Sequence, residues 1–196
     1  MTIEYWADYI CPWCYLALDR VAYLTQAHGA TVRWRPYELH PEVPPEGAPI
    51  PELGKSRDSR RWLRDELAAA QLPTQPRRRW SNSRKALGLS VWAEPLPQWP
   101  ELHRALYRAY FAEGRDIGDT GALLLVAESV GISADAAAEV IGDGAGLTMV
   151  DASKERALDL GIGATPGWLL SDGATFTGVH ARTVFDKVMA RQGRPD

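Results

Sequence analysis

The chain has 196 residues, of which 45% are hydrophobic and 24% are charged, and its formal net charge is −3. Such a chain can bury a sizeable core and fits one domain, or one domain with an insertion. The small net charge argues against a nucleic-acid partner, and no apolar stretch approaches the roughly 18 residues that a membrane-spanning helix requires.

The N-terminal segment lacks the pattern of a secretory signal. It begins Met1-Thr2-Ile3-Glu4, and the first basic residue is Arg20, whereas a secretory signal starts with a basic region. We therefore expect the protein to stay in the cytoplasm.

The first forty residues predict a β-α-β unit. Residues 3–6 and 31–39 have the composition and alternation of strands, and residues 12–28 between them favour a helix. Pro12 suits the first turn of that helix, where no amide hydrogen is needed, and Gly29 suits a left-handed residue at its end.

The middle of the chain predicts helices after a proline-rich connection. Residues 41–51 contain five prolines, which exclude regular structure and indicate a linker or a long ordered loop. In the stretch that follows, Leu102, Leu106 and Tyr110 recur every four residues and so line one helix face. The segments that favour helix are residues 55–71, 77–93, 100–114, 120–130, 134–141 and 147–160.

The last third returns to strands. Residues 168–170 and 175–177 predict two short strands around a turn, and residues 183–191 predict a closing helix. This order is typical of an α/β protein with a thioredoxin-like fold and an inserted all-helical lobe. We place the discontinuous thioredoxin-like domain at residues 1–50 and 146–196, and the inserted helical domain at 51–145.

Two cysteines carry the main chemical signal. Cys11 and Cys14 are separated by Pro12 and Trp13 and lie where a strand passes into a helix. A thiol at a helix N-terminus is favoured as a thiolate. We therefore expect Cys11 to attack a disulfide and Cys14 to resolve the mixed disulfide.

Competing interpretations of the two cysteines are weaker. A zinc site needs about four ligands with regular spacing, and four scattered histidines do not supply them, so we expect no metal. Covalent haem attachment needs histidine directly after the second cysteine, where this chain has Tyr15. Two inert core cysteines stay as an alternative, because cysteine is often buried.

A proline far along the chain supports the redox interpretation. In the thioredoxin fold a cis-proline lies opposite the dithiol, and Pro166 is the only proline between Pro100 and Pro195. We predict a cis bond between Thr165 and Pro166. The expected substrate-binding residues are Pro12, Trp13, Thr165 and Pro166.

Other residues near the motif have two interpretations each. Asp8 is either a proton acceptor for Cys14 or a solvated carboxylate at a strand end. Residues 82–84 either contact a ligand or belong to the lobe helix alone. The tryptophans that either line an apolar substrate groove or serve as core are Trp13, Trp80, Trp92, Trp99 and Trp168.

The sequence resembles the DsbA-like thioredoxin family, and specifically its FrnE-like branch. The segments that carry the resemblance are residues 8–16 (DYICPWCYL), 35–41 (RPYELHP), 107–119 (YRAYFAEGRDIGD), 161–166 (GIGATP) and 176–179 (FTGV). The resemblance implies a dithiol in a groove between the thioredoxin domain and the lobe. It also implies reduction, oxidation or isomerisation of disulfides.

Related branches without the dithiol depend on glutathione, and they include 2-hydroxychromene-2-carboxylate isomerases and kappa-class glutathione transferases. The presence of both cysteines argues against simple membership of those branches. Many relatives have valine before the cis-proline and an aromatic pair after it, whereas this chain has Thr165 before it and Gly167-Trp168 after it.

Three functions are compatible with these residues. The favoured one is a thiol–disulfide oxidoreductase that acts on protein or small-molecule disulfides, exchanges electrons with a cellular thiol reductant or oxidant, and works as a monomer or homodimer. It would have no tightly bound cofactor, although a low-molecular-weight thiol can serve as co-substrate. The alternatives are a thiol-cofactor-dependent isomerase or transferase of a small aromatic substrate, and a redox-independent chaperone or interaction module.

Overall fold

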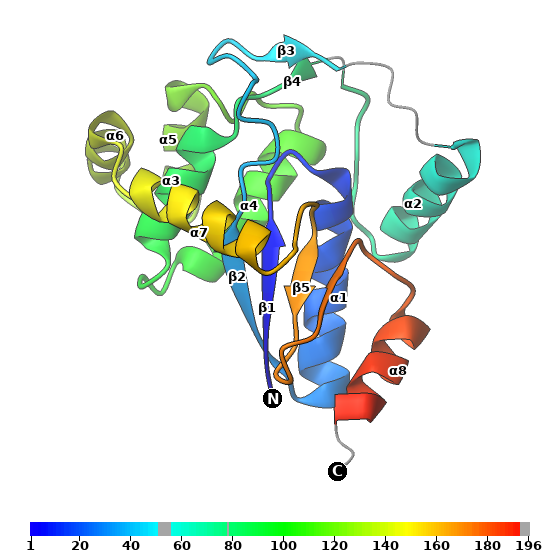
Figure 1. The fold of residues 1–196 in the computed structure, drawn as a ribbon. Helices are drawn as coiled ribbons and strands as arrows, with labels where there is room; N and C mark the ends of the chain where they lie inside the picture. Colours follow the sequence, from blue (N-terminus) through cyan, green and yellow to red (C-terminus); the bar gives the residue numbers. More distant parts are fainter. Residues whose placement is uncertain (51–55, 78, 193–196) are drawn as a thin grey trace.

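A four-stranded mixed sheet forms the centre of the computed structural model, which describes residues 1–50, 56–77 and 79–192 (Figure 1). The strands are β1 (Thr2–Ala7), β2 (Thr31–Pro36), β5 (Gly167–Leu169) and β6 (Thr175–Thr177), in the order β2-β1-β5-β6. β1 pairs in parallel with β2, and β5 pairs antiparallel with both β1 and β6. The expected α/β class is confirmed.

Helix α1 (Pro12–His28) connects the two parallel strands. Pro12 occupies its first turn, and Gly29 ends it with a φ of 62°, a left-handed conformation that glycine adopts without a Cβ clash. The predicted β-α-β unit is confirmed, with β2 shorter than the 31–39 that the sequence indicated.

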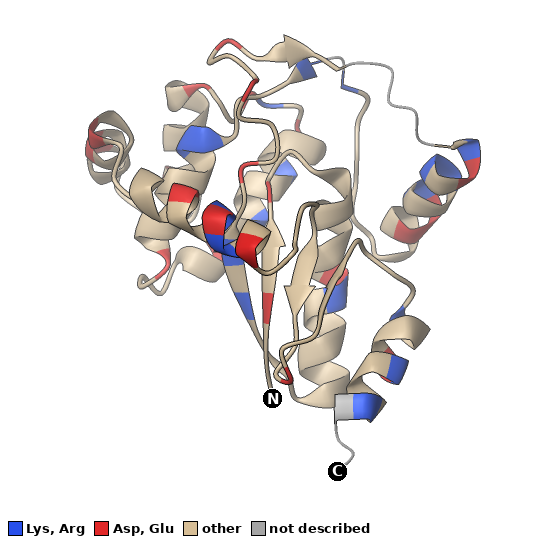
Figure 2. Cartoon of the chain, in the orientation of Figure 1, with Lys and Arg blue, Asp and Glu red and all other residues tan. Residues whose placement is uncertain are grey.

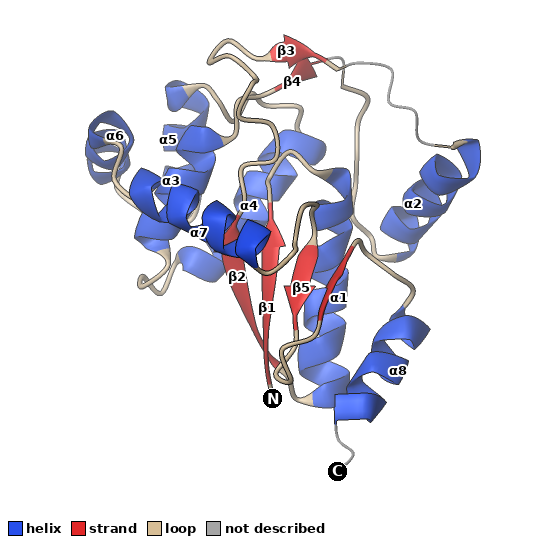
Figure 3. Ribbon diagram, in the orientation of Figure 1, coloured by secondary structure: helices blue, strands red, loops and turns tan. Residues whose placement is uncertain are grey.

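Most of the helices lie between β2 and β5 in the chain. In the described residues these are α2 (Arg57–Ala69), α3 (Arg84–Ala93), α4 (Trp99–Phe111), α5 (Thr120–Ser129), α6 (Ala134–Asp143) and α7 (Leu147–Asp159), and α8 (Arg182–Gln192) follows β6. Figure 3 shows α3 to α6 gathered on one side of the sheet, while α2 stands apart from them and near α1. Helix α7 crosses the face of the sheet opposite to α1 (Figure 1). The domain boundaries given above stay a prediction.

The prediction of helix over residues 77–93 is wrong at its start. Residues 79–80 form the short strand β4 (Arg79–Trp80), which pairs with β3 (Ala48–Pro49), and α3 begins only at Arg84. The expectation that the prolines exclude regular structure over residues 41–51 is therefore wrong at β3, where Pro49 stands in a two-residue ribbon. The Asn82 side chain donates to the Val43 carbonyl at 2.6 Å and accepts the Arg84 amide at 3.0 Å. These bonds attach the segment before α3 to the proline-rich loop instead of leaving it helical.

The two faces of the sheet build two separate cores. Because side chains alternate along a strand, Tyr5 of β1 points toward α1 and α4, and Trp6 points toward α7. The Trp6 indole donates to the carbonyl and the hydroxyl of Ser153 at 3.0 and 3.1 Å. The sheet is therefore covered on both sides.

A buried histidine connects the sheet to the lobe. The Tyr9 hydroxyl donates to the Ser90 hydroxyl at 2.6 Å, so it accepts the proton on Nδ1 of His103 at 2.8 Å. Nε2 of His103 then accepts from the Tyr5 hydroxyl at 2.9 Å. Burial lowers the pKa of His103 to about 3, so the ring is neutral. The network fixes α3 and α4 against β1.

A buried arginine holds α2 in place. Arg20 on α1 is 2% exposed, and its side chain forms ion pairs with Asp19 and with Glu66 of α2. Its Nε donates to the His180 carbonyl at 2.8 Å. One guanidinium therefore joins α1, α2 and the segment that leads into α8.

Charged residues of both signs are interspersed along α2 and α7 (Figure 2). Among the described residues, no helix has both the length and the apolar character that crossing a bilayer demands.

We predict that Gly167→Ala lowers the free energy of unfolding by about 1–3 kcal/mol, the usual cost of overpacking. A Cβ at Gly167 would lie 2.1 Å from Cγ2 of Ile162, whereas one at Gly163 would meet nothing within 4 Å. The matched control Gly163→Ala should be neutral or stabilise by up to about 1 kcal/mol. Urea unfolding of both variants measures the difference, and equal stabilities would contradict the close packing.

Candidate active site

The two cysteines lie at the carboxyl end of β1, where the chain turns into α1. The Cys11 amide donates to the Asp8 carbonyl at 3.2 Å and closes the turn. Cys11 has extended backbone and directly precedes α1, and its carbonyl accepts the amides of Cys14 and Tyr15 at 3.0 and 3.1 Å. The Cys11 thiol is therefore at the positive end of the α1 dipole.

Both thiols are free and buried. Cys11 is 3% exposed and Cys14 is 0% exposed. Of the two thiols, Cys11 is therefore the one with some access to solvent.

The segment before β5 lies against the Cys11 thiol. The bond between Thr165 and Pro166 is cis, as expected. Sγ of Cys11 donates to the Thr165 carbonyl at 3.7 Å, although the two residues are 154 positions apart. The Thr165 hydroxyl is buried and has no hydrogen-bond partner of normal geometry. It is a donor in position to stabilise a thiolate.

The two thiols differ in acidity. Burial raises the pKa of the Cys11 thiol, but the Cys14 thiol, the Thr165 hydroxyl and two nearby amides face its sulfur and lower the pKa below the ordinary value. Burial raises the pKa of Cys14, and the hydrogen bond to Cys11 and the charge of Cys11 raise it further. Cys11 therefore ionises first.

The Asp8 carboxyl is fully buried, so the interpretation as a solvated strand end is wrong. It accepts the Leu39 amide at 2.7 Å, the Ser83 hydroxyl at 3.1 Å and the Ile10 amide at 3.2 Å. Burial outweighs these donors and raises the pKa of Asp8 to about 6. The Asp8 main-chain amide lowers the pKa of Cys14. A role for the carboxyl as proton acceptor stays a prediction.

Trp13, which lies between the two cysteines in the chain, is one of a pair of stacked tryptophans. Trp13 on α1 stacks on Trp62 of α2, with ring centroids 6.1 Å apart and an interplanar angle of 18°. A hollow of about 490 Å³ borders both rings and reaches Val179 and His180. Both rings are part-buried, so they form an apolar wall near Cys11.

Ser83 and Arg84, in residues 82–84, make hydrogen bonds and ion pairs between separate segments of the chain. Ser83 binds Asp8, and Arg84 donates to Glu38 at 2.7 Å and to both carboxylate oxygens of Asp151 at 2.8 Å. These bonds connect α3, the loop after β2, and α7. Ligand contact by these residues stays a prediction.

Sequence reasoning did not identify Trp62, which stacks on Trp13, or Arg20, which holds α2 against α1. Trp62 is one of few apolar residues on the highly charged α2, which signals only that this face is buried. Of the other tryptophans, Trp168 is fully buried in the core, and Trp99 donates to Ser90 in the lobe. In the described ranges, no group of three or more His, Cys, Asp or Glu side chains is placed to hold a metal ion.

The family model of the DSBA-like thioredoxin domain matches residues 2–190 of this chain. Among curated proteins, the uncharacterized protein YwbO of Bacillus subtilis is 24% identical over 134 residues. That alignment covers 66% of each chain, slightly less than two thirds of the relative.

Solved structures of similar fold include three of particular interest. A probable DsbA oxidoreductase from Streptomyces coelicolor has a TM-score of 0.88 at 25% identity, over 100% of this chain and 92% of that one. A 2-hydroxychromene-2-carboxylate isomerase has a TM-score of 0.75 at 19% identity, over 98% and 96%. The cytosolic disulfide reductase DsbM from Pseudomonas aeruginosa has 0.62 at 21%, over 98% and 100%. The expected thioredoxin-like fold is confirmed.

We predict that alkylation of Cys11 by iodoacetamide has its pH midpoint below that of an ordinary thiol. Thr165→Val removes the unpartnered hydroxyl and should raise the midpoint by up to about one unit, because a hydrogen bond to a charged group is worth about 1.5 kcal/mol. Mass spectrometry of the singly labelled protein gives the alkylation rate of Cys11 at each pH, and the midpoint follows from these rates. Thr177→Val, on the exposed strand β6, is the control and should leave the midpoint unchanged. A Thr165→Val midpoint equal to that of the wild type would contradict the role of the hydroxyl.

We predict that Asp8 makes the protein less stable as pH rises. Its folded pKa of about 6 lies above the ordinary 3.8, so its stabilising contribution is complete below about pH 4 and is lost as pH rises through 6. Between pH 4 and 7 the wild type should lose up to about 3 kcal/mol relative to Asp8→Asn. Urea unfolding across this range measures the difference, with Asp143→Asn, an exposed position, as control. A pH-independent difference would show that Asp8 does not titrate as described.

Proposed function

The chain belongs to the DSBA-like thioredoxin domain family, and from this premise we propose that it is a thiol–disulfide oxidoreductase that uses the dithiol Cys11 and Cys14. The observation that carries the proposal is the position of Cys11 at the start of α1, with its sulfur 3.7 Å from the Thr165 carbonyl beside the cis bond to Pro166. The donors around Cys11 lower its pKa, whereas burial and the neighbouring Cys11 raise the pKa of Cys14. A low-pKa thiol beside a high-pKa thiol is the arrangement that two-step disulfide exchange requires.

In the first step the Cys11 thiolate attacks one sulfur of a substrate disulfide. A bond forms between Cys11 and that sulfur, the substrate S–S bond breaks, and the second substrate sulfur leaves as a thiolate. The Thr165 hydroxyl and the amides at the start of α1 stabilise the Cys11 thiolate before the attack. The Thr165 carbonyl and Pro166 form the wall along which an extended substrate segment aligns.

In the second step Cys14 loses its proton and attacks the Cys11 sulfur. The Cys11–Cys14 disulfide forms, and the remaining substrate sulfur leaves as a thiolate, so the substrate gains two electrons that the dithiol loses. The mixed disulfide removes the charge of Cys11, which is one cause of the high pKa of Cys14. Binding of the substrate therefore activates the resolving thiol.

The same pair can also oxidise a substrate. When a cellular oxidant has converted the dithiol to the Cys11–Cys14 disulfide, that disulfide accepts two electrons from substrate thiols. We propose that it works in the cytoplasm without a tightly bound cofactor, on protein or small-molecule disulfides, with a low-molecular-weight thiol as reductant. DsbM is described as cytosolic and was also solved with glutathione, at 20% identity and a TM-score of 0.61. Glutathione is therefore the first thiol to test.

A second candidate is a thiol-dependent isomerase or transferase of a small aromatic molecule. The observation that favours it is the Trp13–Trp62 wall beside Cys11. The wall suits a flat apolar substrate. Loss of both cysteines separates the candidates, because the isomerase needs only the added thiol.

We predict that Cys11→Ser abolishes disulfide reduction and that Cys14→Ser accumulates mixed disulfides through Cys11. Turnover is followed with insulin and with oxidised glutathione, and trapped adducts are identified by mass shift. Trp62→Ala is the companion variant, which should retain the dithiol chemistry and weaken substrate use. Full turnover in the Cys11→Ser/Cys14→Ser double variant would overturn the oxidoreductase and favour the isomerase or transferase.

A further inference from the structure

A second hollow, of about 400 Å³, lies between the β3–β4 ribbon, the end of α4 and the segment that follows α4. No residue of the dithiol site lines it. Its size falls in the range of small-molecule sites. Three of the residues that line it are arginines, Arg77, Arg79 and Arg115.

Arg77 is a part-buried cation without an anionic partner. Its Nη1 donates to the Tyr110 carbonyl at 3.0 Å, and its guanidinium lies 3.9 Å from the Tyr110 ring centroid and 4.0 Å from that of Phe111. In the part of the chain that the structure describes, no carboxylate lies within ion-pair distance of Arg77. Its charge is balanced only by a carbonyl and two ring faces.

Two polar atoms at this hollow are buried and unsatisfied. Nε of Arg77 has no hydrogen-bond partner in the structure, and the Tyr110 hydroxyl has no acceptor for its proton, although the Ser81 amide faces its oxygen. Native proteins contain few such atoms, because each one loses its hydrogen bonds to water without gaining others. Both atoms belong to side chains that line the hollow, so a ligand there would lie next to both side chains.

The other two arginines differ in how they are compensated. Arg115 pairs with Glu113 at 2.8 Å. Arg79 lies at the exposed rim, where it donates to the carbonyls of Glu46 and Gly47 at 3.2 and 2.9 Å, and it has no carboxylate partner among the described residues. Among the described residues, Arg77 and Arg79 therefore contact no carboxylate directly, although three carboxylates also line the hollow.

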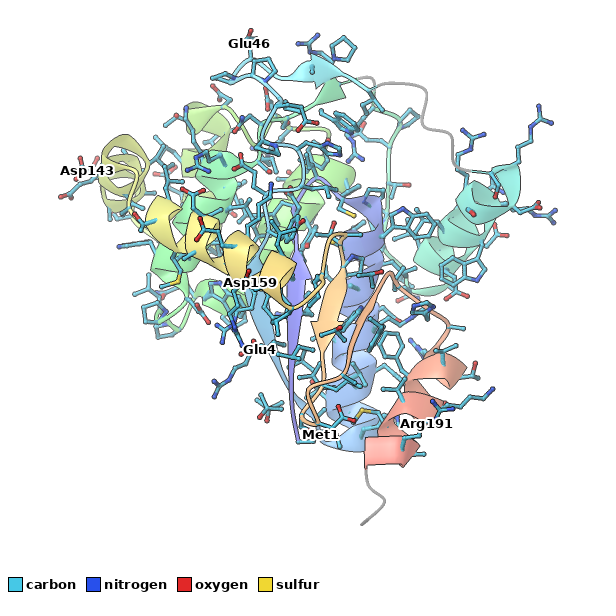
Figure 4. The ribbon with its side chains drawn as sticks, in the orientation of Figure 1. Met1, Glu4, Glu46, Asp143, Asp159 and Arg191 are labelled. Atoms are coloured by element: carbon cyan, nitrogen blue, oxygen red, sulfur yellow. The ribbon has the colours of Figure 1, made fainter. Side chains whose placement is uncertain are left out.

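Three acidic residues also line the hollow, and none of them pairs with Arg77 or Arg79 among the described residues. Glu113 pairs with Arg108 and Arg115. Oδ1 of Asp116 accepts the Gly118 amide at 2.9 Å. Glu46 is exposed, and Figure 4 shows it at the outer edge of the molecule, beside β3. The wall also includes Trp80, one face of which stacks on His40 with ring centroids 4.1 Å apart. The hollow thus offers the guanidinium of Arg77, which has no carboxylate partner among the described residues, and an aromatic surface.

We propose that this hollow, the arginine pocket of Arg77, Arg79, Tyr110 and Trp80, binds a small organic anion. A carboxylate or phosphate group would pair with the two guanidinium groups and accept the Tyr110 hydroxyl, because guanidinium geometry matches both oxyanions. The apolar part of the anion would lie against Trp80. The site is separate from the dithiol and does not depend on the redox chemistry.

The test is an NMR titration of the full chain with sodium benzoate and, separately, with inorganic phosphate. Ionic strength is held constant with NaCl, and the backbone amides of residues 79–81 and 113–116 are followed. We expect saturable shifts with a dissociation constant on the order of 1 mM or lower. Saturation with benzoate alone identifies a carboxylate ligand, and saturation with phosphate alone identifies a phosphate ester. Absence of saturation with both probes would overturn the proposal.

Variants assign the binding to the pocket. Arg77→Gln should weaken binding at least about tenfold, as expected for a lost hydrogen bond to a charged group, while Arg104→Gln, an equal charge change outside the pocket, should leave it unchanged. If Arg77→Gln does not fold, Tyr110→Phe serves instead. It removes a hydroxyl whose proton has no acceptor, so it should weaken binding about threefold or more without lowering Tm. Wild-type affinity in both variants would show that the anion binds elsewhere.

Discussion

The antiparallel pairing of β1 with β5 is the constraint on which the site depends. Trp6 lies opposite Gly167, so the residues just before β5 arrive beside the residues just after β1. This register carries the Thr165 carbonyl to the Cys11 sulfur across 154 positions of sequence. Gly167 permits the approach because a side chain there would collide with Ile162. The dithiol would otherwise be an exposed turn at a helix start.

Burial and local donors together make the two thiols unequal. Burial alone raises the pKa of any thiol, so a low pKa at Cys11 requires donors that face its sulfur, and the start of α1 and the Thr165 hydroxyl supply them. Cys14 lies one turn further along α1, and the charge of Cys11 holds its proton in place. The arrangement needs rigid surroundings, which the His103 network provides on the lobe side and Arg20 provides on the α2 side.

The helices beyond the sheet give this scaffold its individual surfaces. Glu66 pairs with Arg20, which places Trp62 one turn earlier on α2 against Trp13 and forms the aromatic wall near the dithiol. On the lobe, the end of α4 presents Tyr110 to Arg77 and forms a hollow of a different character, positive and only partly apolar. One fold therefore places an aromatic surface at Trp13 and an arginine-lined hollow away from the two cysteines.

Local signals in the sequence determined the β-α-β opening, the ends of α1, the dithiol at its N-terminus and the cis bond before Pro166, because proline, glycine and cysteine restrict the backbone or carry the chemistry where they stand. Tertiary structure decided the late start of α3, since Asn82 binds the Val43 carbonyl, 39 residues earlier in the chain. It also decided the burial of Asp8, the Trp13–Trp62 pair and the unpaired charge of Arg77. These features depend on contacts between side chains from distant segments of the chain, and the local periodicity of the sequence does not predict such contacts.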